Sequence, residues 1–295
     1  MSRLTVCLTH DVDRVYKTYQ YLTHDVRQGK LRRLRTLLTG ERPYWTFDAI
    51  MEMEDRHGAR STFFFLEESI RARLLSPSSW KLAFGRYHFR DRRVAPLIRT
   101  LAEHGWEVGL HGSYQSYRDG ALLRREKESL ESVLGRPVLG IRQHYLNLDV
   151  PTTWQLQRDA GLVYDASFGK KPGIGYRDDR LYPWFDDASG MCVIPLALME
   201  CYLFRDADDR VERAWELTRG LIDQAEREGA VLSVLWHPHM YYDEEFPGYT
   251  EIYQRLLREC SARGARYLTC AEVYAEAAAA RDGAGEPARG AAHGG

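Results

Sequence analysis

Eight short apolar runs recur along the chain, and segments with the periodicity of amphipathic helices separate them. Strands that alternate with helices are typical of βα units in a parallel sheet, not of an antiparallel sandwich. This number of runs is enough to close a barrel, so we expect a single α/β barrel domain. The runs are LTVCLTH from Leu4, RSTFFFL from Arg60, WEVGLH from Trp106, VLGIRQH from Val138, LVYDASF from Leu162, CVIPLAL from Cys192, AVLSVLWH from Ala230 and ARYLT from Ala265.

The segments between these runs predict helices that each bury one face. One apolar face extends from Val211 to Ala225 and stops before Gly229, a residue type that often ends a helix. Two further apolar stripes consist of Tyr253, Leu256, Leu257 and Cys260, and of Leu123, Leu130 and Leu134.

Two stretches lack helical periodicity and are expected to be long loops after strands. Residues 23–43 are basic and contain leucine, and residues 170–189 are rich in Gly, Asp and aromatic residues. In an α/β barrel such loops shape the substrate site at the carboxyl ends of the strands. We expect the barrel domain to span residues 1–280 and the Gly-, Ala- and Pro-rich residues 281–295 to be a disordered tail.

Charge and cysteine content exclude several classes of protein. The 41 Lys and Arg residues balance 42 Asp and Glu residues, which gives no reason to expect nucleic acid or an anionic membrane as partner. The N-terminal residues contain no apolar stretch suited to a signal peptide or membrane span, which predicts a cytoplasmic protein. The five cysteines are scattered and contain no CxxC pair, so neither a disulfide framework nor a thiolate zinc site is expected.

The first run ends in the sequence THDVD, which places two carboxylates close together. Side chains alternate along an extended chain, so Asp11 and Asp13 are expected on the same side. Two like charges at close range raise the pKa of one of them unless a cation separates their roles. A divalent metal would resolve the conflict, with one carboxylate as ligand and the other as base. The alternative is that both residues cap a following helix.

Polar residues also stand at the ends of four other runs, where a purely structural role would favour apolar residues. Because the carboxyl ends of parallel strands meet at one edge of a sheet, we expect these side chains to face a common site. The residues are His111, Arg142, His144, Asp165, His237 and His239.

In their order along the chain, THDVD, LHGSY, RQHY, YDAS and LWHPH resemble the motifs of polysaccharide deacetylases with a NodB-type domain, the family 4 carbohydrate esterases. The resemblance covers the chain up to about residue 275. It implies a distorted (β/α)7-type barrel that removes N- or O-acetyl groups from sugars. The wording of the motifs is closest to a subgroup often found in gene clusters for surface polysaccharides and specialised biosynthesis.

The resemblance also implies roles for individual residues. Asp11 would be the catalytic base and Asp13 a metal ligand, together with His111. Arg142 would orient the base. His237 would protonate the leaving amine with help from Asp165, and a backbone N–H near Tyr145 would hold the oxyanion. The implied cofactor is a divalent metal, with zinc favoured.

Two departures from the family pattern bear on these roles. Val12 separates the two aspartates, which the family usually has side by side. Four residues after His111, Gln115 replaces the usual second histidine, and an amide binds transition metals weakly. His144 stands where the family usually has proline, which leaves His144, Gln115 or water as the third ligand. Contacts to the substrate are expected from Tyr145, Ser113, Trp184, Glu200, Trp236 and His239.

The sequence therefore predicts a hydrolase that removes an acyl group from an amino sugar or a related small amide. One alternative is a non-catalytic sugar-binding protein on a degenerate barrel, a reading that Gln115 favours. Another is a different metal amidohydrolase, which would carry an HxH pair where this chain has His10 and Asp11. The aromatic residues after Leu181 and after His237 either stack on a sugar or pack the loops against the barrel.

Overall fold

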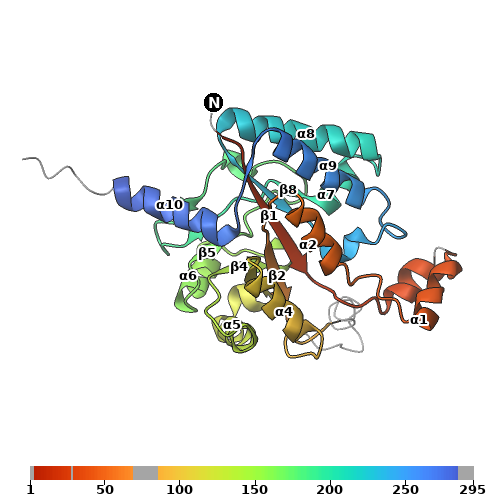
Figure 1. Ribbon diagram of the computed structural model, residues 1–295. Helices are drawn as coiled ribbons and strands as arrows, with labels where there is room; N and C mark the ends of the chain where they lie inside the picture. The colour runs from red at the N-terminus through yellow and green to blue at the C-terminus, as the bar shows by residue number, and fades with distance from the viewer. Residues whose placement is uncertain (1–2, 28, 69–85, 285–295) are drawn as a thin grey trace, which may run out of the picture.

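The computed structural model describes residues 3–27, 29–68 and 86–284. Each of the eight predicted runs contains a strand, and Figure 1 shows the strands at the centre with helices around them. The strands are β1 (Thr5–Val12), β2 (Thr62–Leu66), β3 (Glu107–Gly112), β4 (Gly140–Gln143), β5 (Tyr164–Asp165), β6 (Trp184–Phe185), β7 (Cys192–Val193), β8 (Leu198–Met199), β9 (Val231–Leu235) and β10 (Arg266–Tyr267).

The segment from β7 to β8 closes the sheet into a barrel. Its first part pairs with β5, Leu196 bridges Gly169, and its last part pairs with β9. From β5 the parallel order continues through β4, β3, β2 and β1 to β9, with β6 antiparallel on β7 and β10 beside β1. If the segment from β7 to β8 is counted as one irregular strand, it joins β5, β4, β3, β2, β1 and β9 as the seventh strand of the barrel. This arrangement confirms the expected distorted barrel.

Successive side chains along a strand point alternately into the barrel and outward to the layer beneath the helices. Val6 and Leu8 of β1 belong to the large outer core, whereas Cys7 packs inside with the rings of Phe64 and Tyr164. Glycines make room for these rings, because a Cβ atom on Gly109 would lie 2.6 Å from Phe64 and one on Gly140 would lie 1.9 Å from Tyr164. Aromatic side chains thus fill the interior of the barrel, and the polar residues lie at the carboxyl ends of its strands.

The helices pack around this sheet, with α8 beside α9 and α4 beside α5 (Figure 1). All three predicted apolar stripes lie on helices, and α8 ends at Gly229, whose φ is 70°. The helices are α1 (Arg35–Thr39), α2 (Phe47–Asp55), α4 (Val94–Glu103), α5 (Gly120–Leu134), α6 (Thr152–Asp159), α7 (Glu200–Asp206), α8 (Val211–Glu228), α9 (Tyr249–Ala262) and α10 (Cys270–Ala284).

The structure differs in part from the loops and the disordered tail that the sequence predicts. Residues 23–43 form short helical elements at Tyr21–Val26, Leu31–Leu34 and Arg35–Thr39, because local backbone hydrogen bonds close turns where no amphipathic stripe marks a helix. Residues 170–189 contain little regular structure, as expected. Helix α10 continues past residue 281 to Ala284, and residues 285–295 of the predicted tail lie outside the described residues.

The five cysteines are free, in agreement with their scattered positions. Among the described residues, no helix combines the length and the apolar character that crossing a membrane would require.

Candidate metal centre and active site

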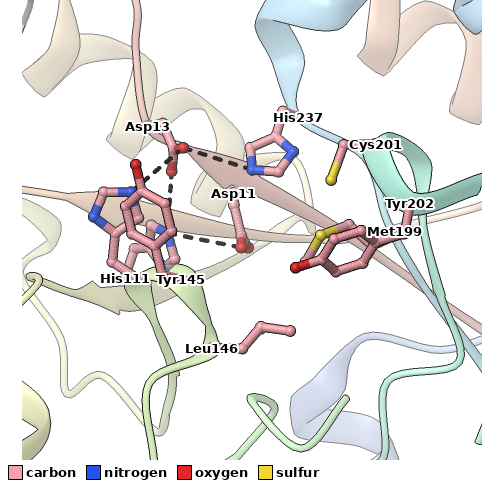
Figure 2. A pocket seen from close by; sticks show the side chains of 10 residues that line it. Asp11, Asp13, His111, Tyr145, Leu146, Met199, Cys201, Tyr202 and His237 are labelled. Atoms are coloured by element: carbon pink, nitrogen blue, oxygen red, sulfur yellow. Dashed lines mark hydrogen bonds and ion pairs between the residues drawn. The ribbon is translucent and has the colours of Figure 1, made fainter. Parts of the chain in front are cut away.

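A cavity of about 210 Å³ opens among the residues that follow the strands. Both aspartates of the first motif line it, as the alternation along β1 predicts. Figure 2 shows them facing histidines that come from other strand ends. The lining residues are Asp11, Asp13, His111, His144, Tyr145, Leu146, Met199, Cys201, Tyr202 and His237.

Asp13, His111 and His144 form a compact cluster whose potential ligand atoms all lie within 4.8 Å of one another. The Nε2 atom of His111 is 3.1 Å from Oδ1 of Asp13, and Nε2 of His144 is 3.5 Å from Oδ2. One carboxylate and two imidazoles are a donor set that binds zinc and related ions. The residues present therefore fit a divalent cation, and His144 is the third member of the cluster.

The Nδ1 atoms of the two histidines face groups outside the cluster, which orients both Nε2 atoms toward Asp13. His111 Nδ1 lies 2.8 Å from the carbonyl oxygen of Arg142, and His144 Nδ1 lies 3.5 Å from Oε2 of Glu68. Such partners fix the ring orientation of metal-binding histidines. Glu68 was missed in the sequence, although it follows β2 with the same parity as the interior residue Phe64.

The buried side chain of Arg142 contacts Asp11. The Nη1 atom of Arg142 donates to Oδ1 of Asp11 at 3.0 Å and to Oγ1 of Thr9 at 2.6 Å. The other oxygen, Oδ2, lies 3.7 Å from Nε2 of His111. Asp11 thus presents one oxygen to the cavity beside the three-residue cluster.

His237 faces Asp13 from the side opposite to His111, as Figure 2 shows. Its Nε2 atom is 3.6 Å from Oδ2 of Asp13, and its Nδ1 atom donates to the buried carboxylate of Glu200. Burial opposes the charged form, but the negative charges of Glu200 and Asp13 outweigh it and raise the pKa of His237 to about 10.

The expected partnership between Asp165 and His237 is not found. Both oxygens of Asp165 accept hydrogen bonds within its own neighbourhood, from the backbone and hydroxyl of Ser167 and from Gln157, each at 2.8 Å. The carboxylate of Asp165 at the end of β5 faces Gln157 of α6, and Glu200 is the carboxylate in contact with Nδ1 of His237.

The charges of the cluster act on one another. Burial alone would raise the pKa of Asp13, but the charges of His144 and His237 and the hydrogen bond from His111 hold it well below its usual range. Burial likewise opposes protonation of His144, yet Asp13 and Glu68 raise its pKa to about 9. The neighbouring histidines therefore favour the anionic form of Asp13.

Tyr145 lines the cavity in an unusual backbone conformation, with φ of 58° and ψ of 18°. The next residue, Leu146, also has a positive φ of 51°. Non-glycine residues seldom adopt this region, and where they do the surrounding structure must enforce it. The turn places Tyr145 and Leu146 on the wall of the cavity.

Several predicted site residues lie away from the cavity. Gln115 is exposed at the start of a short helical turn, which removes it from the ligand set. Ser113 is buried, and its backbone N–H donates to Glu126. Trp236 is buried in the core and not at the cavity, and Trp184 packs against the core, as the packing alternative for that loop predicts. His239 packs between Tyr44 and Phe246 and does not line the cavity.

An apolar wall was not anticipated from the sequence. It consists of Leu146, Met199, Cys201 and Tyr202, of which the last three stand at the end of β8 and the start of α7. The only signal was their position after the sixth predicted run, next to Glu200.

No family model and no curated protein matches the sequence. Solved structures nevertheless share the fold over most of the chain. A protein described as a polysaccharide deacetylase from Mycobacterium smegmatis is 17% identical, with a TM-score of 0.57 over 95% of this chain and 92% of that one. An allantoinase is 14% identical, with a TM-score of 0.64 over 94% and 91%. A protein described as a polysaccharide deacetylase from Pseudomonas aeruginosa is 13% identical, with a TM-score of 0.62 over 93% and 90%.

Proposed function

We propose that this chain is a metal-dependent hydrolase that removes an acyl group from an amino sugar or a related small amide. The observation that carries the proposal is that Asp13, His111 and His144 line one cavity together with Asp11 and His237. A base, an acid and a ligand set are what hydrolysis of an amide requires. The names of two solved structures with this fold, both polysaccharide deacetylases, accord with this reaction.

Asp13, His111 and His144 would hold the divalent cation, and zinc suits their donor atoms. When bound, the cation supplies Lewis acidity, which acidifies water and polarises a carbonyl group. The same three residues position the acyl group of the substrate near Asp11.

Asp11 accepts the proton of the attacking water through its cavity-facing oxygen, while Arg142 keeps the carboxylate in place. His237 gives its proton to the departing amine, since Glu200 maintains the imidazolium. The backbone N–H of Tyr145 stabilises the oxyanion. The wall of Leu146, Met199 and Cys201 accepts a short acyl chain.

The proposal is tested by loading the chain with zinc and measuring carboxylic acid release from N-acetylated amino sugars and small acyl amides. Release that depends on zinc and stops with Asp11→Asn supports a hydrolase. The alternative of a non-catalytic sugar-binding protein predicts saturable sugar binding in calorimetry with no acid released from any substrate. That result would overturn the proposed activity.

A further inference from the structure

A second cavity, of about 400 Å³, adjoins the candidate active site. Leu146 lines both cavities, so they lie on either side of the same residue. Three of the lining side chains are cationic, and no carboxylate is among the described residues that line it. The lining residues are Leu146, Asn147, Leu148, Lys170, Lys171 and Arg177.

The segment that carries these cations is fixed to the barrel. Gly169 bridges Leu196 in the closing strand, and the backbone N–H of Gly175 donates to the carbonyl of Ala197 at 2.7 Å. The buried Tyr176 adds a hydrogen bond from its hydroxyl to the carbonyl of Val231 at 3.1 Å. Anchors on both sides of the segment hold the three cations at the cavity.

Two of the three cationic side chains make contacts with the residues around them. Nζ of Lys171 donates to the carbonyl of Tyr145 at 2.5 Å, which joins this cavity to the wall of the active site. The guanidinium of Arg177 lies 4.3 Å from the ring centroid of Phe168. Its Nε is 3.5 Å from Oδ2 of Asp178, but that pair is exposed at 42% and 70%, and exposed pairs attract weakly.

We propose that this basic cavity binds a phosphate or diphosphate group of the substrate. A concave surface lined by charges of one sign concentrates its field and attracts the opposite charge. Lysine binds phosphate as a point charge, and the arginine fork matches phosphate oxygens in a bidentate manner. Among the described residues that line the cavity three are cationic and none is a carboxylate, so a multiply charged phosphate balances this charge better than a single carboxylate does.

The inference deepens the proposed function, on which it rests, by naming the class of substrate. The shared residue Leu146 and the contact between Lys171 and Tyr145 place the anion next to the acyl group (Figure 2 shows Tyr145 and Leu146). The substrate is then an acylated amine that carries a phosphate ester or a diphosphate within the same small molecule.

The binding experiment uses calorimetry with sodium pyrophosphate and the full chain freed of metal by a chelator, so that pyrophosphate cannot bind a cation at the active site. We expect saturable binding that Lys170→Ala and Arg177→Ala each weaken about tenfold, the loss of one charged hydrogen bond. Arg180→Ala is the matched control, because Arg180 lies in the same segment but does not line the cavity. Absent binding, or equal weakening by Arg180→Ala, would overturn the inference.

Two further experiments are needed. One distinguishes a phosphate site from a carboxylate site, and the other tests the phosphate site separately from the proposed hydrolase activity. Citrate replaces pyrophosphate as a carboxylate probe, and tighter binding of citrate would refute the phosphate assignment. In the zinc-loaded enzyme, kcat/KM is compared for N-acetylglucosamine and its 1-phosphate, and we expect Arg177→Ala to reduce the preference for the phosphate about tenfold. Pyrophosphate binding without hydrolysis would refute only the hydrolase, whereas hydrolysis without pyrophosphate binding would refute only the phosphate site.

Discussion

His237 donates from Nδ1 to the carboxylate of Glu200, a residue 37 positions earlier in the chain. Glu200 begins α7 directly after β8, and His237 follows β9. These strands are parallel neighbours with Met199 opposite Leu235, so their register brings the two residues together. The contact points Nε2 of His237 into the cavity and favours its protonated form.

Replacement of Glu200 by glutamine is expected to lower the pKa of His237, because the negative charge that raises it is lost. A general acid works only while protonated, so the alkaline limb of the kcat profile shifts to lower pH and kcat falls about 10- to 100-fold. A pH–rate profile of Glu200→Gln that coincides with wild type would remove Glu200 from the mechanism.

His237→Ala should reduce kcat about 10²- to 10⁴-fold, because the general acid itself is removed.

Asp11→Asn is expected to abolish turnover while the fold and bound zinc persist, because the base is lost but a polar side chain of equal size remains beside Arg142. Acid release, zinc content and circular dichroism check the three parts of this prediction. Appreciable acid release by the variant would show that Asp11 is not the base.

His144→Ala is expected to weaken zinc binding at least about tenfold, because an imidazole of the cluster is removed. Gln115→Ala is the matched control and should bind zinc like wild type, since Gln115 is exposed and does not line the cavity. Zinc titration with a competing chelator measures both. Wild-type affinity in His144→Ala would mean that water or another group completes the site, and tighter binding by Gln115→His would indicate a weakened form of the usual site.

Asp165→Ala is expected to lower the free energy of unfolding by about 1–3 kcal/mol, because Gln157 and Ser167 lose a buried acceptor. Its pH–rate profile should keep the shape of the wild-type profile, since Asp165 does not pair with His237. Denaturant unfolding and the rate profile together test the assignment. A shift of the alkaline limb would restore Asp165 to a role beside His237.

Glu54→Ala is expected to destabilise the protein by about 3–5 kcal/mol, because the buried groups of His10, Trp106 and Tyr253 lose their shared acceptor. Burial opposes ionisation of Glu54, but these donors, His10 first, hold its pKa below the usual value. The stabilisation is therefore present above the unfolded pKa of about 4.3 and is lost as the pH falls further. Glu52→Ala on the exposed face of α2 is the control, with a change within about 0.5 kcal/mol in urea unfolding.

The sequence determined which segments became strands and which end of the barrel carries the candidate site. Each predicted apolar run contains a strand, and β1 and β2 are buried along their whole length. The alternation of side chains along an extended chain placed Asp11 and Asp13 together, and it brought Arg142 and His144 to the same end of β4. These features depend on local chain geometry, which a sequence displays directly.

Tertiary structure decided which residues lie together in the candidate site. The choice of His144 over Gln115 depends on the turn after β4, where Tyr145 and Leu146 adopt positive φ. The choice of Glu200 over Asp165 depends on the closing strand, which leaves β5 to pair with β9 and so carries Glu200 to His237. Contacts between distant segments follow from the register of the strands and the path of the loops, and no local pattern in the sequence encodes either.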